Sequence, residues 1–188
     1  MGFLDTLRGR RTVPKANLDA LFQLPDAAVT LETAAGFKPT GAGAVCYRAA
    51  AGGAAVQTQA DIVALLDADD DGPDVEKAVD GFGFTWLVSH QDDMSLLCTD
   101  LHAINLVLQE QGYGDSVLCS LVPFRDAAGR TVGVVYLYKQ GTFYPFAPTG
   151  PQSRDNLLEI QIRDQLAAEL PIEKDLSRWM ALWGAPGL

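Results

Sequence analysis

SVLCSLVPFRDAAGRTVGVVYLYKQ (116–140) holds two apolar runs separated by a short polar turn, and this pattern decides the fold. Both runs, SVLCSLVPF (116–124) and RTVGVVYLYKQ (130–140), are rich in the β-branched and aromatic residues that favour strands. The RDAAGR turn between them supplies an Asp and a Gly, which are typical of hairpin connections. We therefore predict an antiparallel β-hairpin.

Four further segments have the composition of strands. AAVTLET (27–33) and GAVCYRA (43–49) are separated by the Gly- and Pro-containing GFKPTGAG, and FTWLVSH (84–90) is the strongest of the four. TFYPFAP (142–148) is predicted as a short edge strand, because Pro145 has no N–H to donate to a central ladder.

The clearest helix is predicted from Met94 to Gln111, closed by Gly112. Its apolar residues recur at helical spacing and should form one buried stripe: Leu97, Leu101, Ile104 and Leu108.

Four other helices are predicted with less periodicity to support them. NLDALFQL (17–24) should end at Pro25, and QTQADIVALLDAD (57–69) should follow the second strand. RDNLLEIQIRDQLAAEL (154–170) should have Ser153 as its N-cap, and a last helix should cover 173–182.

This element order predicts an α+β fold in which an antiparallel sheet is backed by helices. Residues 16–188 are expected to form a single domain that follows a basic leader, 1–15. Both parts of the domain, 16–80 and 81–188, run helix, strands, helix, so a second interpretation is that they are pseudo-duplicated halves.

Charge and hydropathy exclude several function classes. The chain has 188 residues, 48% hydrophobic, and a net charge of -10, which argues against a nucleic-acid-binding protein. No apolar run approaches the roughly 20 residues of a membrane span, so pores and transporters are excluded. We expect a cytoplasmic protein, since three widely spaced cysteines do not suggest a disulfide framework.

The leader differs from the rest of the chain, because residues 1–15 carry four basic residues against one acidic residue. If residues 2–11 form a helix, they would combine an apolar face with a basic end. We expect weak, salt-sensitive contact with an anionic membrane or an acidic partner, and the alternative is a solvated leader. The residues concerned are Phe3, Leu4, Leu7, Arg8, Arg10 and Arg11.

The cysteines offer the main alternative function. Cys46 and Cys119 lie in strand-like runs and are expected to be core residues. Cys98 and His102 are helical i, i+4 neighbours, so a small enzyme or metal-binding protein centred on them is the alternative. No second ligand pair accompanies them, and we expect no catalytic residue set, no cofactor and no resident metal.

The acidic stretch DADDDGPDVEKA (67–78) begins like a calcium-binding loop. Ala78 stands where such a loop needs a bidentate carboxylate. The stretch is therefore predicted to be a solvated linker, because closely spaced like charges extend the chain.

Two aromatic groups could serve either packing or recognition. The stretch YLYKQGTFYPFAP is interpreted either as a partner surface or as a cover for the core, through Tyr136, Tyr138, Phe143, Tyr144 and Phe146. Trp179 and Trp183, near the C-terminus, are expected to dock on the domain.

Many segments along the chain resemble the PspA-associated protein B family. The most specific are YLYKQGTFYPFAP (136–148) and the ending DLSRW-x₃-WGAPGL (175–188). The others are MGFLD-x-L-x-GR, DALF-x-LP, GFKPTGAGAVCYRA, GFTWLV, TDLHAIN, VLCSLV and RDN-x-LE.

The resemblance implies a small cytoplasmic accessory of the phage-shock envelope-stress system, with no catalytic residues to carry over. It implies PspA or an HtpX-type membrane protease as partner. The hypothesis is therefore a non-enzymatic adaptor working at or near the inner face of the cytoplasmic membrane.

Overall fold

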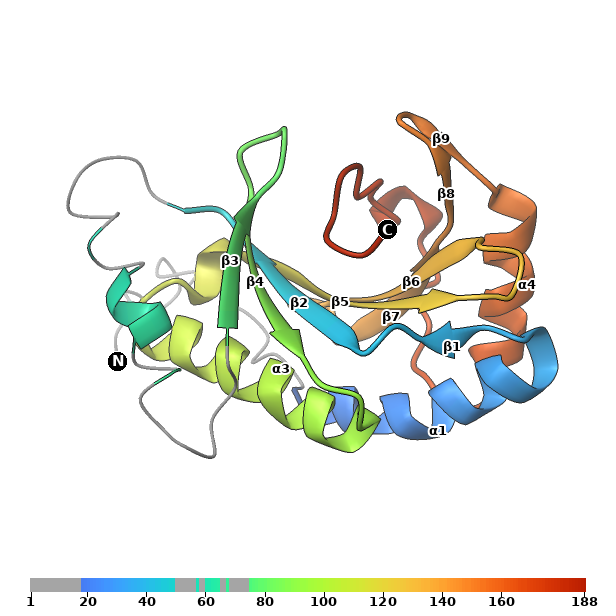
Figure 1. The fold of residues 1–188 in the computed structure, drawn as a ribbon, viewed down its shortest axis with the longest axis horizontal. Coiled ribbons are helices and arrows are strands. Elements are labelled where there is room, and N and C mark those ends of the chain that lie inside the picture. The colour runs from blue at the N-terminus through green and yellow to red at the C-terminus, as the bar shows by residue number, and fades with distance from the viewer. Residues whose placement is uncertain (1–17, 50–56, 58–59, 65–66, 68–74) are drawn as a thin grey trace, which may run out of the picture.

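A computed structural model describes residues 18–49, 57, 60–64, 67 and 75–188. Its centre is a seven-stranded sheet in the order β3-β4-β2-β5-β6-β7, with β1 pairing on β5. All of these pairs are antiparallel (Figure 1). The strands are β1 Lys38–Pro39, β2 Ala42–Tyr47, β3 Val75–Val79, β4 Thr85–His90, β5 Val117–Arg125, β6 Thr131–Leu137 and β7 Thr142–Phe146.

Helices and short turns complete the described residues, and the predicted α+β class is confirmed. The α-helices with assigned bounds are α1 Leu24–Thr30, α3 Met94–Glu110 and α4 Asn156–Leu166. Residues 57 and 60–64 are also α-helical, in agreement with the helix predicted over 57–69 as far as that stretch is described. Short helices of other types are η2 Leu18–Gln23, η3 Leu31–Ala35, η4 Gly114–Ser116 and η5 Leu176–Arg178, and a small separate hairpin pairs β8 Pro148–Gly150 with β9 Ser153–Arg154.

The hairpin predicted over 116–140 is confirmed as β5 and β6, whose register runs from Arg125 opposite Thr131 to Cys119 opposite Leu137. Asp126 holds the turn, because its Oδ1 accepts hydrogen bonds from the backbone N–H groups of Ala128 (3.0 Å) and Arg130 (2.8 Å). Local turn chemistry is therefore enough to fix this pairing.

The predicted duplication is not confirmed. Strand β2, from the first proposed half, lies between β4 and β5 of the second. The two stretches therefore contribute to one sheet, in which their strands alternate.

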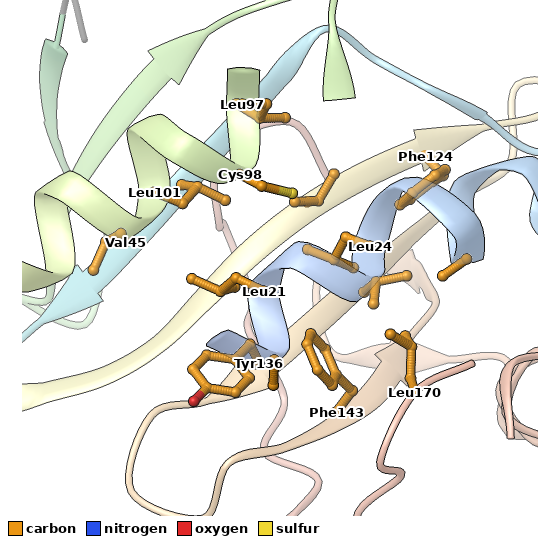
Figure 2. Close-up of a cluster of buried hydrophobic side chains, with 14 of the residues drawn as sticks. Leu21, Leu24, Val45, Leu97, Cys98, Leu101, Phe124, Tyr136, Phe143 and Leu170 are labelled. Atoms are coloured by element: carbon orange, nitrogen blue, oxygen red, sulfur yellow. The ribbon is translucent and has the colours of Figure 1, made fainter. Parts of the chain in front are cut away.

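The helices α1 and α3 lie along one side of the sheet (Figure 1). The predicted stripe on α3 is confirmed, since its four residues are fully buried: Leu97, Leu101, Ile104 and Leu108. The helix lies very close to β2, because a Cβ added at Gly43 would be 3.1 Å from Leu97 Cδ1. Figure 2 shows Leu97, Cys98 and Leu101 of α3 grouped with Leu21 and Leu24 of the N-terminal helical run.

Residues 18–35 form one helical run, so the predicted strand over 27–33 is wrong. Pro25 does not end the helix, because it occupies the first turn of α1, where a missing N–H costs no hydrogen bond. Val29 is 62% exposed whereas Leu31 is fully buried. Residues two apart thus point in opposite senses, as they do on a helix and not on a strand.

Two other boundaries differ from the predictions. The acidic stretch ends in a strand, since Val75–Val79 pairs with β4 and forms one edge of the sheet. The N-cap of α4 is Asp155, which accepts a hydrogen bond from Leu158 N, while Ser153 belongs to β9. The strand at 142–148 is confirmed as β7 at the opposite edge.

The sheet is buried on both faces, which explains why its central strands are almost continuously apolar. Strands β2, β5 and β6 have one buried cluster on the helix side and another on the opposite side. The second cluster is covered by the C-terminal segment, 175–188 (Figure 1). Within the described part of the chain, no helix combines the length and apolarity needed to cross a bilayer.

Candidate functional site

The C-terminal segment lies on the sheet face opposite α1 and α3 without forming the helix predicted over 173–182. Only the single turn Leu176–Arg178 is helical. Trp179 stacks on Tyr144 (ring centroids 5.8 Å apart), and Trp183 meets Phe146 edge-on (5.1 Å). The prediction that these tryptophans dock on the domain is confirmed, and their packing outweighs the helical periodicity of the segment.

Polar contacts fix the same segment to the domain. The Tyr144 hydroxyl donates to the carbonyl of Met180 (3.0 Å). Arg154 donates from Nη1 to the carbonyl of Trp179 (3.1 Å) and from Nε to the buried carboxylate of Glu159 (2.8 Å). Because Arg154 links the segment to α4, the C-terminus is an integral layer of the fold.

A cavity of about 170 Å³ lies between the sheet and the C-terminal segment, and we call it the thiol cavity. Its floor is formed by β2, β4 and β5, one wall comes from the β3–β4 hairpin, and Met180–Trp183 supplies the roof. The lining is predominantly apolar: Cys46, Phe82, Phe84, Trp86, Leu118, Cys119, Met180, Ala181, Leu182 and Trp183, together with Asp80.

Asp80 is the only carboxylate among these lining residues, and it is engaged in structure. Its Oδ2 accepts from the indole N–H of Trp86 (3.0 Å), and its Oδ1 accepts from the backbone N–H groups of Phe82 and Phe84. These bonds shape the β3–β4 turn. The rim next to it is apolar, since Phe82 is 62% and Met180 40% exposed.

Two thiols lie side by side at the floor of the thiol cavity. Cys46 of β2 is directly opposite Cys119 of β5, and both are buried. A hydrogen bond with Cys46, together with burial, holds the pKa of the Cys119 thiol well above its usual value. Sequence analysis predicted both as core residues, which is confirmed, but it missed their pairing because strand register is not visible in composition.

A second concavity, which we call the basic groove, lies beside the β6–β7 turn and α4. It is an open groove of about 1090 Å³. Its lining includes four cationic side chains, Lys139, Arg163, Lys174 and Arg178, although the whole chain carries a net charge of -10. Two of them are ion-paired, Arg163 with Asp164 (2.6 Å) and Arg178 with Glu173 (3.4 Å). Leu176, which is 56% exposed, adds an apolar contact.

Glu173 organises one wall of the basic groove. Its side chain is buried, and burial opposes its ionisation, but hydrogen bonds from Asp175 N, Thr142 Oγ1 and Arg178 outweigh this effect. They lower the pKa of Glu173 below its usual value. The backbone N–H of Glu173 also donates to the carbonyl of Phe143 (2.7 Å), so the groove is tied to the edge strand β7.

Cys98 and His102 do not form a reactive pair in the structure. Burial and the nearby charge of Asp93 raise the pKa of the Cys98 thiol to about 12, so thiolate is scarce at neutral pH. The His102 ring packs against Phe22 with centroids 5.4 Å apart. Among residues 18–49, 57, 60–64, 67 and 75–188, no three His, Cys, Asp or Glu side chains come together in a metal-binding group.

The five aromatic residues offered as a partner surface are not exposed. All are buried, at 6% exposure or less, so they close the core: Tyr136, Tyr138, Phe143, Tyr144 and Phe146. The strand β7 is an edge, but residues 171–173 hydrogen-bond to its backbone at Phe143, and the C-terminal tryptophans pack on the rings of Tyr144 and Phe146.

The leader residues Phe3, Leu4, Leu7, Arg8, Arg10 and Arg11 lie outside the described residues. Their proposed membrane contact is therefore a prediction only. The basic groove was not predicted from the sequence, because its cations come from the β6–β7 turn, α4, the loop at Lys174 and η5, and they are not contiguous along the chain.

Comparison with known protein families shows what the chain is similar to. A family model described as PspA associated protein B matches residues 1–187 of the chain. No curated protein and no solved structure matches.

Proposed function

The chain belongs to the PspA associated protein B family, and from this premise we propose that it is an adaptor of the PspA envelope-stress response that binds PspA directly. The observation that carries the proposal is the extent of the match, which spans 187 residues and includes both the sheet and its covering C-terminal segment. The family description names an association with PspA, and the adaptor role interprets that association as physical contact.

The basic groove is the docking surface that we propose for PspA. It combines long cationic side chains with one exposed apolar residue, Leu176, in a concave surface next to α4. Charge complementarity speeds association and sets orientation, while a buried apolar anchor contributes most of the binding energy. The groove therefore fits an acidic segment that carries an apolar side chain.

The proposed place of action is the inner face of the cytoplasmic membrane. The support is the composition of the leader, in which Phe3, Leu4 and Leu7 precede Arg8, Arg10 and Arg11. Each basic residue near an anionic leaflet contributes about 1 kcal/mol. This attraction supports weak, transient contact with an anionic leaflet.

An HtpX-type membrane protease is the second partner of the same proposal. The family description favours PspA over it, because PspA is the protein that the description names. The enzyme alternative at Cys98 and His102 is disfavoured, since a buried thiol with a pKa of about 12 is a poor nucleophile at neutral pH.

The test is capture from stressed cells. The full chain with an affinity tag should retain PspA after a low-salt wash and lose it as salt increases, because exposed charges are screened. A chain in which Lys174 and Arg163 are both replaced by Glu should capture less. Equal capture by both chains would contradict the assignment of the groove, and no PspA with either chain would contradict the adaptor role.

A further inference from the structure

Two soft donors, Cys46 and Cys119, lie together in the lining of the thiol cavity. Cys46 and Cys119 are directly opposite each other on neighbouring antiparallel strands. Their Cα atoms are therefore separated by about 4.5–5.5 Å. Both side chains belong to the cluster on the C-terminal side of the sheet, so they share one face.

The surroundings of this pair suit a soft ion better than a hard one. Met180 lines the same cavity from the roof, so the lining contains a third residue with a soft sulfur atom in its side chain. The single carboxylate, Asp80, is occupied by Trp86 and by two backbone N–H groups. Soft thiolate and thioether donors select Cu(I), Zn²⁺ and iron–sulfur clusters, whereas carboxylate and carbonyl oxygens suit Mg²⁺, Ca²⁺ and Mn²⁺. A closed zinc site needs four ligands, so a pair of thiols favours Cu⁺.

The cavity also offers a way in. Its volume of about 170 Å³ is several times the space that one water molecule needs. The roof residue Met180 and the wall residue Phe82 are both substantially exposed, so the mouth lies at the surface. The thiols themselves lie below this mouth, with Cys46 2% and Cys119 0% exposed, so an ion reaches them only when the side chains above them shift.

We propose that Cys46 and Cys119 form a binding site for a single Cu⁺ ion in the thiol cavity. The ion replaces the proton shared between the thiols: Cu⁺ binds both sulfur atoms, one thiol loses its proton to solvent, and the other keeps its own. No electron is transferred. One positive charge enters and one leaves, so the apolar site stays neutral, which avoids the high cost of burying an uncompensated charge.

The test is an anaerobic titration of the fully reduced chain with Cu⁺ in competition with a coloured Cu⁺ chelator. The full chain should withdraw one ion per molecule and release one proton per ion. Cys46→Ala and Cys119→Ala should each weaken binding by about 100-fold or more, because losing one of two linked donors removes the chelate advantage. Cys98→Ala is the matched control, because Cys98 is the third cysteine and is buried on the opposite face of the sheet. This variant should bind Cu⁺ like the unmodified chain.

A measurement on the unmodified chain covers the case in which the variants do not fold. X-ray absorption of the copper-loaded chain should show sulfur as the only neighbours of the ion. Nitrogen or oxygen neighbours, or no uptake by the reduced chain, would overturn the proposal. So would binding that disappears in Cys98→Ala but persists in Cys46→Ala and Cys119→Ala.

Discussion

Tyr144 of the edge strand β7 stacks on Trp179 of the C-terminal segment, with 5.8 Å between ring centroids and 23° between ring planes. The Trp179 indole also donates to the carbonyl of Glu173 (3.1 Å). Trp179 is only 7% exposed, although it belongs to no helix or strand. The end of the chain is therefore held by an aromatic anchor.

Trp179→Ala is expected to lower the free energy of unfolding by about 3–5 kcal/mol, the range found for truncating a buried aromatic side chain. Urea denaturation measures it. Leu157→Ala is the control, because Leu157 is 69% exposed on α4 and should change stability by about 0.5 kcal/mol or less. Similar small effects for both variants would show that the segment is not part of the stable fold.

The lowered pKa of Glu173 predicts how the stability of the fold depends on pH. Its pKa is lowered in the folded chain, so its contribution is present above the unfolded pKa and is lost as the pH falls through the folded value. Glu173→Gln should therefore destabilise the chain at pH 7, and the gap between variant and parent should shrink once the pH falls below the ordinary value of 4.5. Urea unfolding at a series of pH values tests this, and a gap of constant size would contradict it.

Cys98 should react slowly with an alkylating reagent in the folded chain. Its pKa is raised to about 12, so little thiolate is present at neutral pH. The alkylation rate at neutral pH should therefore be low. The alkylation rate of Cys98 is measured by mass mapping of the modified peptide at a series of pH values, and the unfolded chain serves as the reactive reference. Rapid modification near pH 7 would restore the enzyme alternative, as would loss of the stress phenotype in a stably folded Cys98→Ala chain.

The leader is expected to give weak, reversible binding to acidic membranes. Burial of three apolar side chains and the attraction of the basic residues nearly balance the cost of ordering the segment, about 1–2 kcal/mol per residue. Co-sedimentation should show low-salt binding to anionic liposomes, little to neutral ones, and none for a chain lacking residues 2–11. Equal binding with and without the leader would remove its membrane role.

Local patterns predicted much of the fold. The β5–β6 hairpin could be predicted because Asp126 and Gly129 supply turn chemistry, and α3 because four leucine and isoleucine residues recur at helical spacing. Pro25 led to a wrong helix boundary, because a proline disrupts the interior of a helix but is tolerated in its first turn. The strand Val75–Val79 was missed because it follows an acidic run and has only one buried residue, Val75.

The site depends on contacts that are distant in sequence. Cys46 and Cys119 meet only because β2 pairs with β5 in one register, and a shift by one residue would turn one thiol to the other face. The basic groove likewise joins Lys139 to residues 163–178 across the β6–β7 turn. No local propensity encodes either arrangement, so neither could be predicted from composition or spacing.

The most direct test of the account is a binding titration between the purified full chain and purified PspA. We expect saturable binding that weakens by about 10-fold in the doubly substituted Arg163→Glu, Lys174→Glu chain, because like charges then face the acidic partner. The matched control is Lys38→Glu with Arg125→Glu, which makes the same charge change where β1 pairs with β5, outside the groove lining. This control should bind PspA like the parent chain. Absence of PspA binding by the parent chain would contradict the adaptor role, and equal weakening by both double substitutions would contradict the assignment of the basic groove.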